Sequence, residues 1–195
     1  MRISPVGLWC FDQPEALARD VRTVSIVTHK HPDSIAAAHA IATSVSWVLQ
    51  RAEIDATTMC QHLAASVGKE SPLSSLLLEL PHWLELPEDE ALKRIAGDYP
   101  LFAKEGNFGV PVSAIPTALA AVYAFLRHPH DYLTTIETTL RFGGDVDTVG
   151  AIAGAISGAF NGVDAIPQHL RENVRDSDFM TTLATDFYRA FLKSR

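Results

Sequence analysis

The chain has 195 residues, with a hydrophobic fraction of 47% and a charged fraction of 20%, which suits one globular domain over residues 1–195. Its net charge is −7 and its basic residues do not cluster, which argues against a nucleic-acid partner and against an anionic membrane surface. Two cysteines are too few for a disulfide framework, and no signal peptide or apolar run of membrane-spanning length is apparent, so we expect a cytoplasmic protein.

Apolar residues recur at helical spacing along most of the chain, and no stretch has the alternation of a β-strand. A first helix begins near Asp12, and the segment 28–33 ends it because Pro32 disfavours helical angles in the preceding residue. Asp33 or Ser34 is expected to cap the long helix that follows. Residues 57–71 are expected to form a helix followed by a loop. Further helices are predicted over residues 72–86, 87–97, 116–127, 131–140, 147–162 and 178–193. The fold class is therefore all-α.

Two of these helices carry a specific expectation about packing. The helix 147–162 has a glycine at every fourth position, and each interior glycine costs about 1 kcal/mol relative to alanine. Close contact with a neighbouring helix would offset that cost, so the glycine face is expected to pack tightly. The last helix is expected to bury four large apolar residues, Phe179, Leu183, Phe187 and Phe191.

Two glycines precede the helix 147–162, followed by two carboxylates and a hydroxyl: Gly143, Gly144, Asp145, Asp147 and Thr148. One interpretation is helix capping, because Asp and Thr are common N-cap residues and acids suit the start of a helix. The other is a cation site, because Mg²⁺ prefers about six oxygen ligands and these side chains supply some of them. The two interpretations are compatible, since each carboxylate has two oxygens.

Two other segments are candidates for a binding site. His29 and His31 flank a turn, but no third ligand accompanies them at the spacing of a metal site, so a zinc site is not expected. The loop around Asn107, Phe108 and Gly109 either lines a pocket or forms a simple turn, and its composition does not decide between the two.

Residues 143–155 resemble the C-terminal signature of the ADP-ribosylglycohydrolases, all-α hydrolases that remove ADP-ribose from proteins and related acceptors with two Mg²⁺ or Mn²⁺ ions. Residues 28–36, 108–118 and 125–127 resemble other stretches of that family in the same order. The resemblance implies a compact, multi-helix orthogonal bundle with the helix 147–162 as a central core helix. It implies that the metal ligands are Asp145, Asp147 and Thr148. It implies that bound ADP-ribose lies beside His29, Asn107, Phe108, Gly109, Val110, Gly143 and Gly144.

The resemblance extends over nearly the whole chain but over only the C-terminal two-thirds of the family's domain. The family's catalytic acidic residue, its paired aspartates and its Gly-rich phosphate loop precede that part, so the catalytic residue is unknown here. We therefore expect little or no hydrolysis by this chain alone.

We also expect exposed apolar surface around Ile3, Leu8 and the Gly-rich helix, covered by a chain that supplies the N-terminal half or by self-association. The expected ligand is ADP-ribose or an ADP-ribosylated acceptor. The alternatives are a non-catalytic ADP-ribose-binding or scaffold protein, and an all-α domain with a relict signature.

Overall fold

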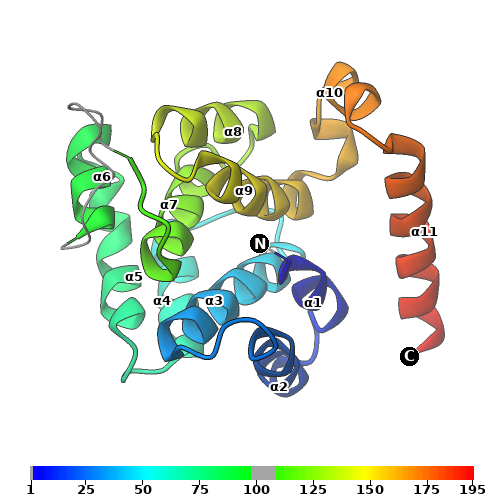
Figure 1. The fold of residues 1–195 in the computed structure, drawn as a ribbon, viewed down its shortest axis with the longest axis horizontal. Helices are drawn as coiled ribbons and strands as arrows, with labels where there is room; N and C mark the ends of the chain where they lie inside the picture. Colours follow the sequence, from blue (N-terminus) through cyan, green and yellow to red (C-terminus); the bar gives the residue numbers. More distant parts are fainter. Residues whose placement is uncertain (1, 98–108) are drawn as a thin grey trace.

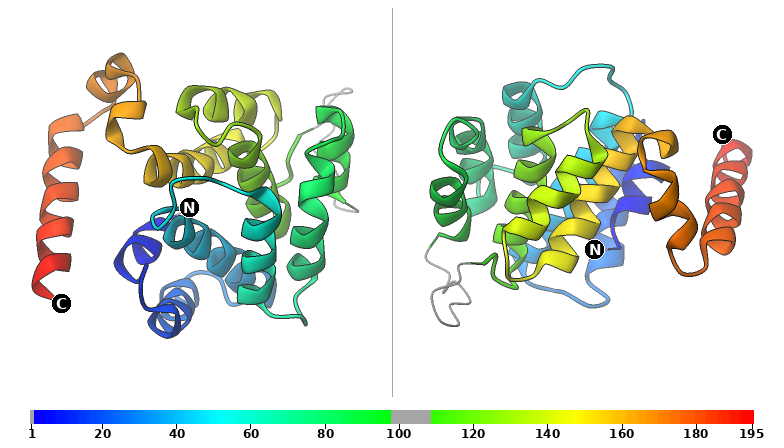
Figure 2. Two further views of the ribbon diagram at one scale, coloured as in Figure 1. Left: turned by 180° about the vertical axis from the view of Figure 1, so that it is seen from behind. Right: turned by 90° about the horizontal axis from the view of Figure 1, so that it is seen from above.

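The computed structural model describes residues 2–97 and 109–195, and the regular structure in this part of the chain is helical (Figures 1 and 2). The elements are α1 (Ser4–Trp9), α2 (Pro14–Ser25), α3 (Pro32–Val48), α4 (Ala56–Val67), α5 (Pro72–Trp83), α6 (Glu88–Ala96), α7 (Ala114–Arg127), α8 (Tyr132–Arg141), α9 (Val146–Asn161), the 3-10 turn η1 (Val163–Ala165), α10 (Gln168–Asn173) and α11 (Ser177–Lys193). The all-α prediction is confirmed. None of these helices is long and apolar enough to cross a membrane.

The predicted cap of the long helix α3 is wrong. The N-cap residue is His31, whose Nδ1 accepts a hydrogen bond of 3.3 Å from the backbone N–H of Asp33. Pro32 takes the first helical position, because its fixed φ suits that position and its lack of an N–H costs nothing there. The cap therefore moves to the residue before the proline, and Asp33 and Ser34 lie in the first turn.

The core is organised around α7. Every residue of this helix from Ile115 to Leu126 is buried, and so are the last nine residues of α3, from Ala40 to Val48. Helix α9 lies between α8 on one side and α3 and α7 on the other (Figure 1). The helix that is buried on all sides is thus α7, whereas α9 buries the face made by Val149, Ile152, Ala153, Ile156 and Ser157.

The glycine face of α9 packs against α8. A Cβ atom added to Gly150 would lie 3.2 Å from Thr139 Oγ1, and one added to Gly154 would lie 3.1 Å from Ile136 Cδ1. The contact loosens along the helix, because a Cβ at Gly158 would lie 4.0 Å from the Tyr132 ring and one at Gly162 would meet nothing. Tight packing of the glycine face is confirmed at the N-terminal half of α9.

The prediction that the last helix, α11, buries four large apolar residues is wrong, because no residue of this helix is buried. Phe179 is 64% exposed and Leu183 is 50% exposed. On the C-terminal half Phe187 and Phe191 are half-buried, and their rings lie 5.4 and 5.9 Å from the Trp9 ring. Figures 1 and 2 show α11 at the edge of the molecule. The apolar period set the face of the helix, but within residues 2–97 and 109–195 the elements that contact α11 leave Phe179 and Leu183 exposed.

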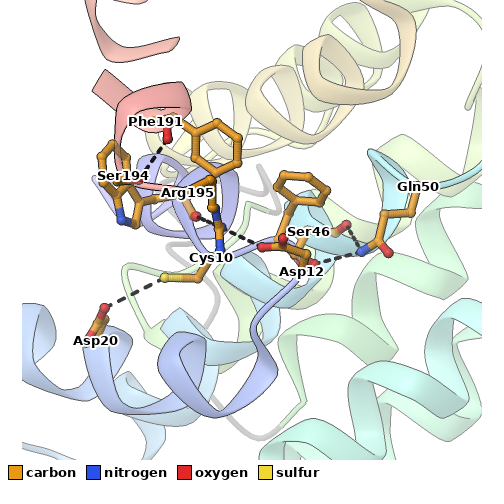
Figure 3. A network of polar contacts seen from close by, with 10 residues as sticks. Cys10, Asp12, Asp20, Ser46, Gln50, Phe191, Ser194 and Arg195 are labelled. Carbon is orange, nitrogen blue, oxygen red and sulfur yellow. Dashed lines mark hydrogen bonds and ion pairs between the residues drawn. The ribbon is translucent and has the colours of Figure 1, made fainter. Parts of the chain in front are cut away.

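Polar contacts fasten the end of α11 to the turn between α1 and α2 (Figure 3). Arg195 donates hydrogen bonds to the Trp9 carbonyl at 3.1 Å and to Asp12 Oδ1 at 2.5 Å. Ser46 and Gln50 on and after α3 donate to the Phe11 carbonyl at 3.0 and 2.8 Å. The turn between α1 and α2 thus connects the C-terminal helix α11 to the end of α3.

The expected exposed surface lies elsewhere. Ile3 is buried, with 6% of its surface exposed, and Leu8 is half-buried against the core. In the described part of the chain beyond α9, the exposed large apolar residues are Val163, Leu170, Val174, Phe179, Met180, Leu183, Tyr188 and Leu192. The prediction of apolar exposure around Ile3 is therefore wrong. Helix α1 packs onto α3, and Ile3, which directly precedes α1, is buried in this contact region.

Candidate functional site

Two glycine-containing segments cross where α7 and α9 begin. The N–H of Val110 donates to the Gly143 carbonyl at 3.1 Å, and the N–H of Asp145 donates to the Val110 carbonyl at 3.1 Å. The approach is closer than side chains allow: a Cβ on Gly109 would lie 2.4 Å from the Gly144 nitrogen, and one on Gly144 would lie 2.2 Å from the Val110 oxygen. Gly144 also has a φ of +73°. The crossing therefore requires glycine and holds Asp145 at the start of α9.

Three helices of this protein begin with the same pattern, Asp-x-x-Thr. Asp55 before α4 accepts from the backbone N–H of Thr58 at 2.7 Å, and Asp131 before α8 accepts from that of Thr134 at 3.0 Å. The Asp145 side chain before α9 has no such bond to the helix backbone, and its Oδ1 accepts a hydrogen bond from the Thr148 hydroxyl at 2.9 Å. Asp145 thus occupies an N-cap position without capping the helix through its side chain.

The ionisation of these carboxyls differs in the same way. Hydrogen bonds from Thr58 and Thr134 lower the pKa of Asp55 and Asp131. Burial raises the pKa of the Asp145 carboxyl, against a lowering by the Thr148 hydroxyl, and the neighbouring Asp147 carboxyl adds to the rise. Two acids therefore stand close together at the start of α9, and a cation beside them would favour their charged forms.

A cavity of about 850 Å³ opens in front of this helix start. Its polar lining includes His29, Asp145 and Thr148, which the sequence had singled out. The larger part of its wall is apolar and comes from α3, α7 and α9: Ala37, Ala38, Ile41, Ala114, Ile115, Ala118 and Ile152. This volume lies in the range of small-molecule sites.

The remaining candidates lie behind or beside the cavity. Gly109, Val110, Gly143 and Gly144 form the backbone crossing and do not line the cavity, and Asp147 is exposed next to Asp145. Asn107 and Phe108 lie outside the described residues. The glycines therefore act on the site through the position of Asp145.

Sequence reasoning missed several polar residues of the lining. Arg2 Nη2 donates to Thr28 Oγ1 at 2.9 Å, and the same hydroxyl lies 2.9 Å from His29 Nδ1. Asp33 also lines the cavity, 3.5 Å from His31 Nδ1. Asp33 and Thr28 belong to the polar segment 28–33, whose pattern predicts the end of a helix. The sequence signal for Arg2 is a resemblance: residues 1 and 2 match a position just after the Gly-rich phosphate loop of the family that the chain resembles.

The side chains at the start of α9 carry oxygen donors, which are the type of ligand that a hard divalent cation prefers. The oxygens of Asp145, Asp147 and Thr148 gather within one helical turn, and carboxylate and hydroxyl oxygens are ligands of Mg²⁺ and Mn²⁺. Within residues 2–97 and 109–195, no group of three or more His, Cys, Asp and Glu side chains is arranged to hold a metal ion. The start of α9 thus supplies two carboxylates and one hydroxyl, which is a partial ligand set.

Comparison with known proteins gives one family. The family model described as ADP-ribosylglycohydrolase matches residues 1–195. ADP-ribosylhydrolase ARH3 of Mus musculus is 27% identical over 125 residues, which are 56% of this chain and 34% of the mouse protein. ARH3 of Danio rerio is 36% identical over 94 residues, 43% of this chain and 25% of that protein. An uncharacterised protein of Archaeoglobus fulgidus is 25% identical over 194 residues, 99% of this chain and 58% of its own length. The chain thus spans roughly a quarter to three-fifths of these relatives.

Proposed function

Because this chain belongs to the ADP-ribosylglycohydrolase family, we propose that its cavity binds ADP-ribose or an ADP-ribosylated acceptor. In this proposal the protein takes part in hydrolysis that removes ADP-ribose from a protein or small acceptor. The ARH3 relatives are ADP-ribosylhydrolases by name, which is consistent with that activity. The cytoplasmic location and the self-association expected from the sequence stay predictions.

The observation that carries the proposal is the state of Asp145. Its carboxylate lies on the wall of the 850 Å³ cavity and forms no bond to the helix backbone, although its helix starts with the same pattern as α4 and α8. Aspartates that serve only as caps have their oxygens bound to backbone N–H groups. A carboxylate held at a cavity wall without that role has its lone pairs available for a ligand.

We assign Asp145, Asp147 and Thr148 as the residues that would hold Mg²⁺ or Mn²⁺. The ion would supply Lewis-acid polarisation and a template for substrate hydroxyls. The chain's own residues supply the rest of the binding. The carboxylates of Asp145 and Asp147 supply negative charge beside the cavity, which attracts the cation. The Thr148 hydroxyl orients Asp145 by donating to its Oδ1. The apolar wall excludes water from the bound ligand.

The same model gives His29 a binding role. Its Nδ1 lies 2.9 Å from Thr28 Oγ1, and this contact limits rotation of the imidazole at the cavity wall. Asn107, Phe108, Gly109 and Val110 are proposed, from the family resemblance, to lie beside the bound ADP-ribose. Of these, Val110 is held by backbone hydrogen bonds with Gly143 and Asp145. The catalytic acid is not assigned to a residue of this chain.

The test is isothermal titration calorimetry of ADP-ribose binding, with and without Mn²⁺. The wild type is expected to bind ADP-ribose more tightly in the presence of Mn²⁺. Asp145→Ala should raise the Kd measured with Mn²⁺ at least about tenfold, because a charged carboxylate ligand of the ion is lost. Asp131→Ala is the matched control, since it removes an aspartate from the same pattern at α8, outside the cavity. Equal metal-dependent affinity in the wild type and Asp145→Ala would refute the assignment.

A second measurement separates the two function classes. Release of ADP-ribose from a modified protein by the purified chain would support the hydrolase, and the expectation of little turnover by this chain alone would then be wrong. Tight binding without turnover under the same conditions would favour a non-catalytic ADP-ribose-binding protein.

A further inference from the structure

The cavity contains one arginine, in a protein whose net charge is −7. Arg2 is exposed and makes no ion pair with a carboxylate within residues 2–97 and 109–195. Its next neighbour, Ile3, is buried in the core and also lines the cavity, so the backbone that carries the guanidinium is anchored. A cationic side chain without a carboxylate partner at a cavity wall is available to an anionic ligand.

Thr28 holds this guanidinium in place. Its Oγ1 accepts from Arg2 Nη2 at 2.9 Å and lies at the same distance from His29 Nδ1, so three side chains of the lining form one hydrogen-bonded row. A guanidinium has five N–H donors, and this bond uses one of them. The remaining donors lie in a planar fork, whose geometry matches the oxygens of a phosphate.

The other charges of the cavity indicate where an anion is tolerated. Asp33 lines the cavity with its carboxylate near His31, and Asp145 lines it at the start of α9. Both carboxylates repel a phosphate, whereas Arg2 is the only permanently charged cation among the residues that line this cavity. A ligand that carries negative charge is therefore expected to bind with that charge at Arg2.

We propose that Arg2, positioned by Thr28, binds the diphosphate of an ADP-ribosyl ligand. This inference rests on the proposed function, because it takes the ligand class from there and adds the residue that recognises its charge. Arg2 is the binding residue and Thr28 is a positioning residue that acts through it. His29, at the other side of the Thr28 hydroxyl, completes the polar edge against which the diphosphate lies.

The test measures the Kd of ADP-ribose, and separately of ADP, for the wild type and variants at low and high salt. Arg2→Ala should raise both Kd values about tenfold or more and weaken their salt dependence, because a charge-assisted contact is lost. Arg2→Lys should restore part of the affinity, since it keeps the charge without the fork. Arg189→Ala, which removes an exposed arginine paired with Asp186 on α11, should leave both Kd values unchanged.

Thr28 is tested by a pair of substitutions. Thr28→Val removes the hydroxyl but keeps the shape, and should weaken ADP binding about threefold, because the guanidinium loses one fixed contact. Thr28→Ser should restore wild-type affinity. Far-ultraviolet circular dichroism checks that the variants are folded. Thr28→Val and Thr28→Ser are both expected to give the wild-type spectrum, whereas a general loss of structure would change it.

The outcomes separate this inference from the proposed function. Binding of ADP-ribose with the same Kd and salt dependence in Arg2→Ala would overturn the role of Arg2 and leave the proposed function standing. A second outcome is that the wild type binds ADP but not ADP-ribose, and that Arg2→Ala weakens the binding of ADP. This result would support the anion site at Arg2 and refute the proposed function. Absence of wild-type binding to both ligands would refute both.

Discussion

The three Asp-x-x-Thr helix starts share their pattern but not their geometry. Asp55 and Asp131 have extended backbones, with ψ of 117° and 100°, and their carboxylates cap α4 and α8. Asp145 has a φ of −81° and a ψ of 53°, outside the range of an N-cap, and its carboxylate does not bond to the backbone of α9. The same four-residue pattern therefore builds two structural caps and one side chain that is available at a cavity wall.

The cause of the difference lies before the aspartate. The N–H of Asp145 is bound to the Val110 carbonyl, and Gly144 has a φ of +73° that only glycine adopts without strain. This crossing sets the backbone at Asp145 before α9 begins. Neither Asp55 nor Asp131 follows such a crossing in the described part of the chain. What the comparison teaches is that a neighbouring segment, far away in sequence, selects the role of a helix-start aspartate.

The largest expected effect comes from breaking the crossing. Gly144→Ala should destabilise the protein by about 3 kcal/mol or more, because the strain of a positive φ adds to a backbone collision with Val110. Gly162→Ala is the matched control, with a φ of +77° and nothing near its Cβ, and should cost only about 1–2 kcal/mol. Urea unfolding measures both, and equal losses would mean that the crossing is not rigid.

Removing the aspartates themselves should separate stability from binding. Asp131→Ala is expected to cost about 1 kcal/mol of unfolding free energy, the usual value for a lost cap. Asp145→Ala should change stability by less than about 0.5 kcal/mol, because no backbone bond is lost and repulsion from Asp147 is relieved. A larger stability loss from Asp145→Ala than from Asp131→Ala would show that Asp145 is a cap after all.

The pH dependence offers the smallest effect. Hydrogen bonds from Thr134 lower the pKa of Asp131 in the folded state, so its contribution is present above the unfolded pKa of about 4 and is lost as the pH falls. The stability difference between wild type and Asp131→Asn should therefore shrink below about pH 4. The pKa of Asp145 is raised, which gives the opposite trend.

Carboxyl titration followed by nuclear magnetic resonance tests this prediction directly in the ion-free protein. The Asp131 resonance should titrate at a lower pH than the Asp145 resonance. The reverse order would contradict the distinction between a bonded and an unbonded carboxylate. Mn²⁺ must be absent from the sample, because this ion is paramagnetic and broadens the resonances.

Local patterns predicted much of the molecule. The helical period located most of the helices, and the glycines of α9 predicted the close contact with α8, because both signals act between residues near in sequence. The failures have a common reason. Phe179 and Leu183 lie on an apolar face that no other element reaches, and the His31 cap depended on how Pro32 entered α3. Arg2 lines the cavity beside Thr28, from which it is separated by 26 residues in the chain.

The sequence by itself determined the all-α class, the family and the residue types at the start of α9, because periodicity, glycine and oxygen donors can be identified without coordinates. Tertiary structure alone decided that Asp145 lies at a cavity wall while Asp55 and Asp131 cap their helices. The physical reason is the crossing of Val110 and Gly144, a pair of backbone hydrogen bonds between segments that are distant in the chain. Such long-range bonds set the local backbone angles, and those angles decide what a carboxylate can bind.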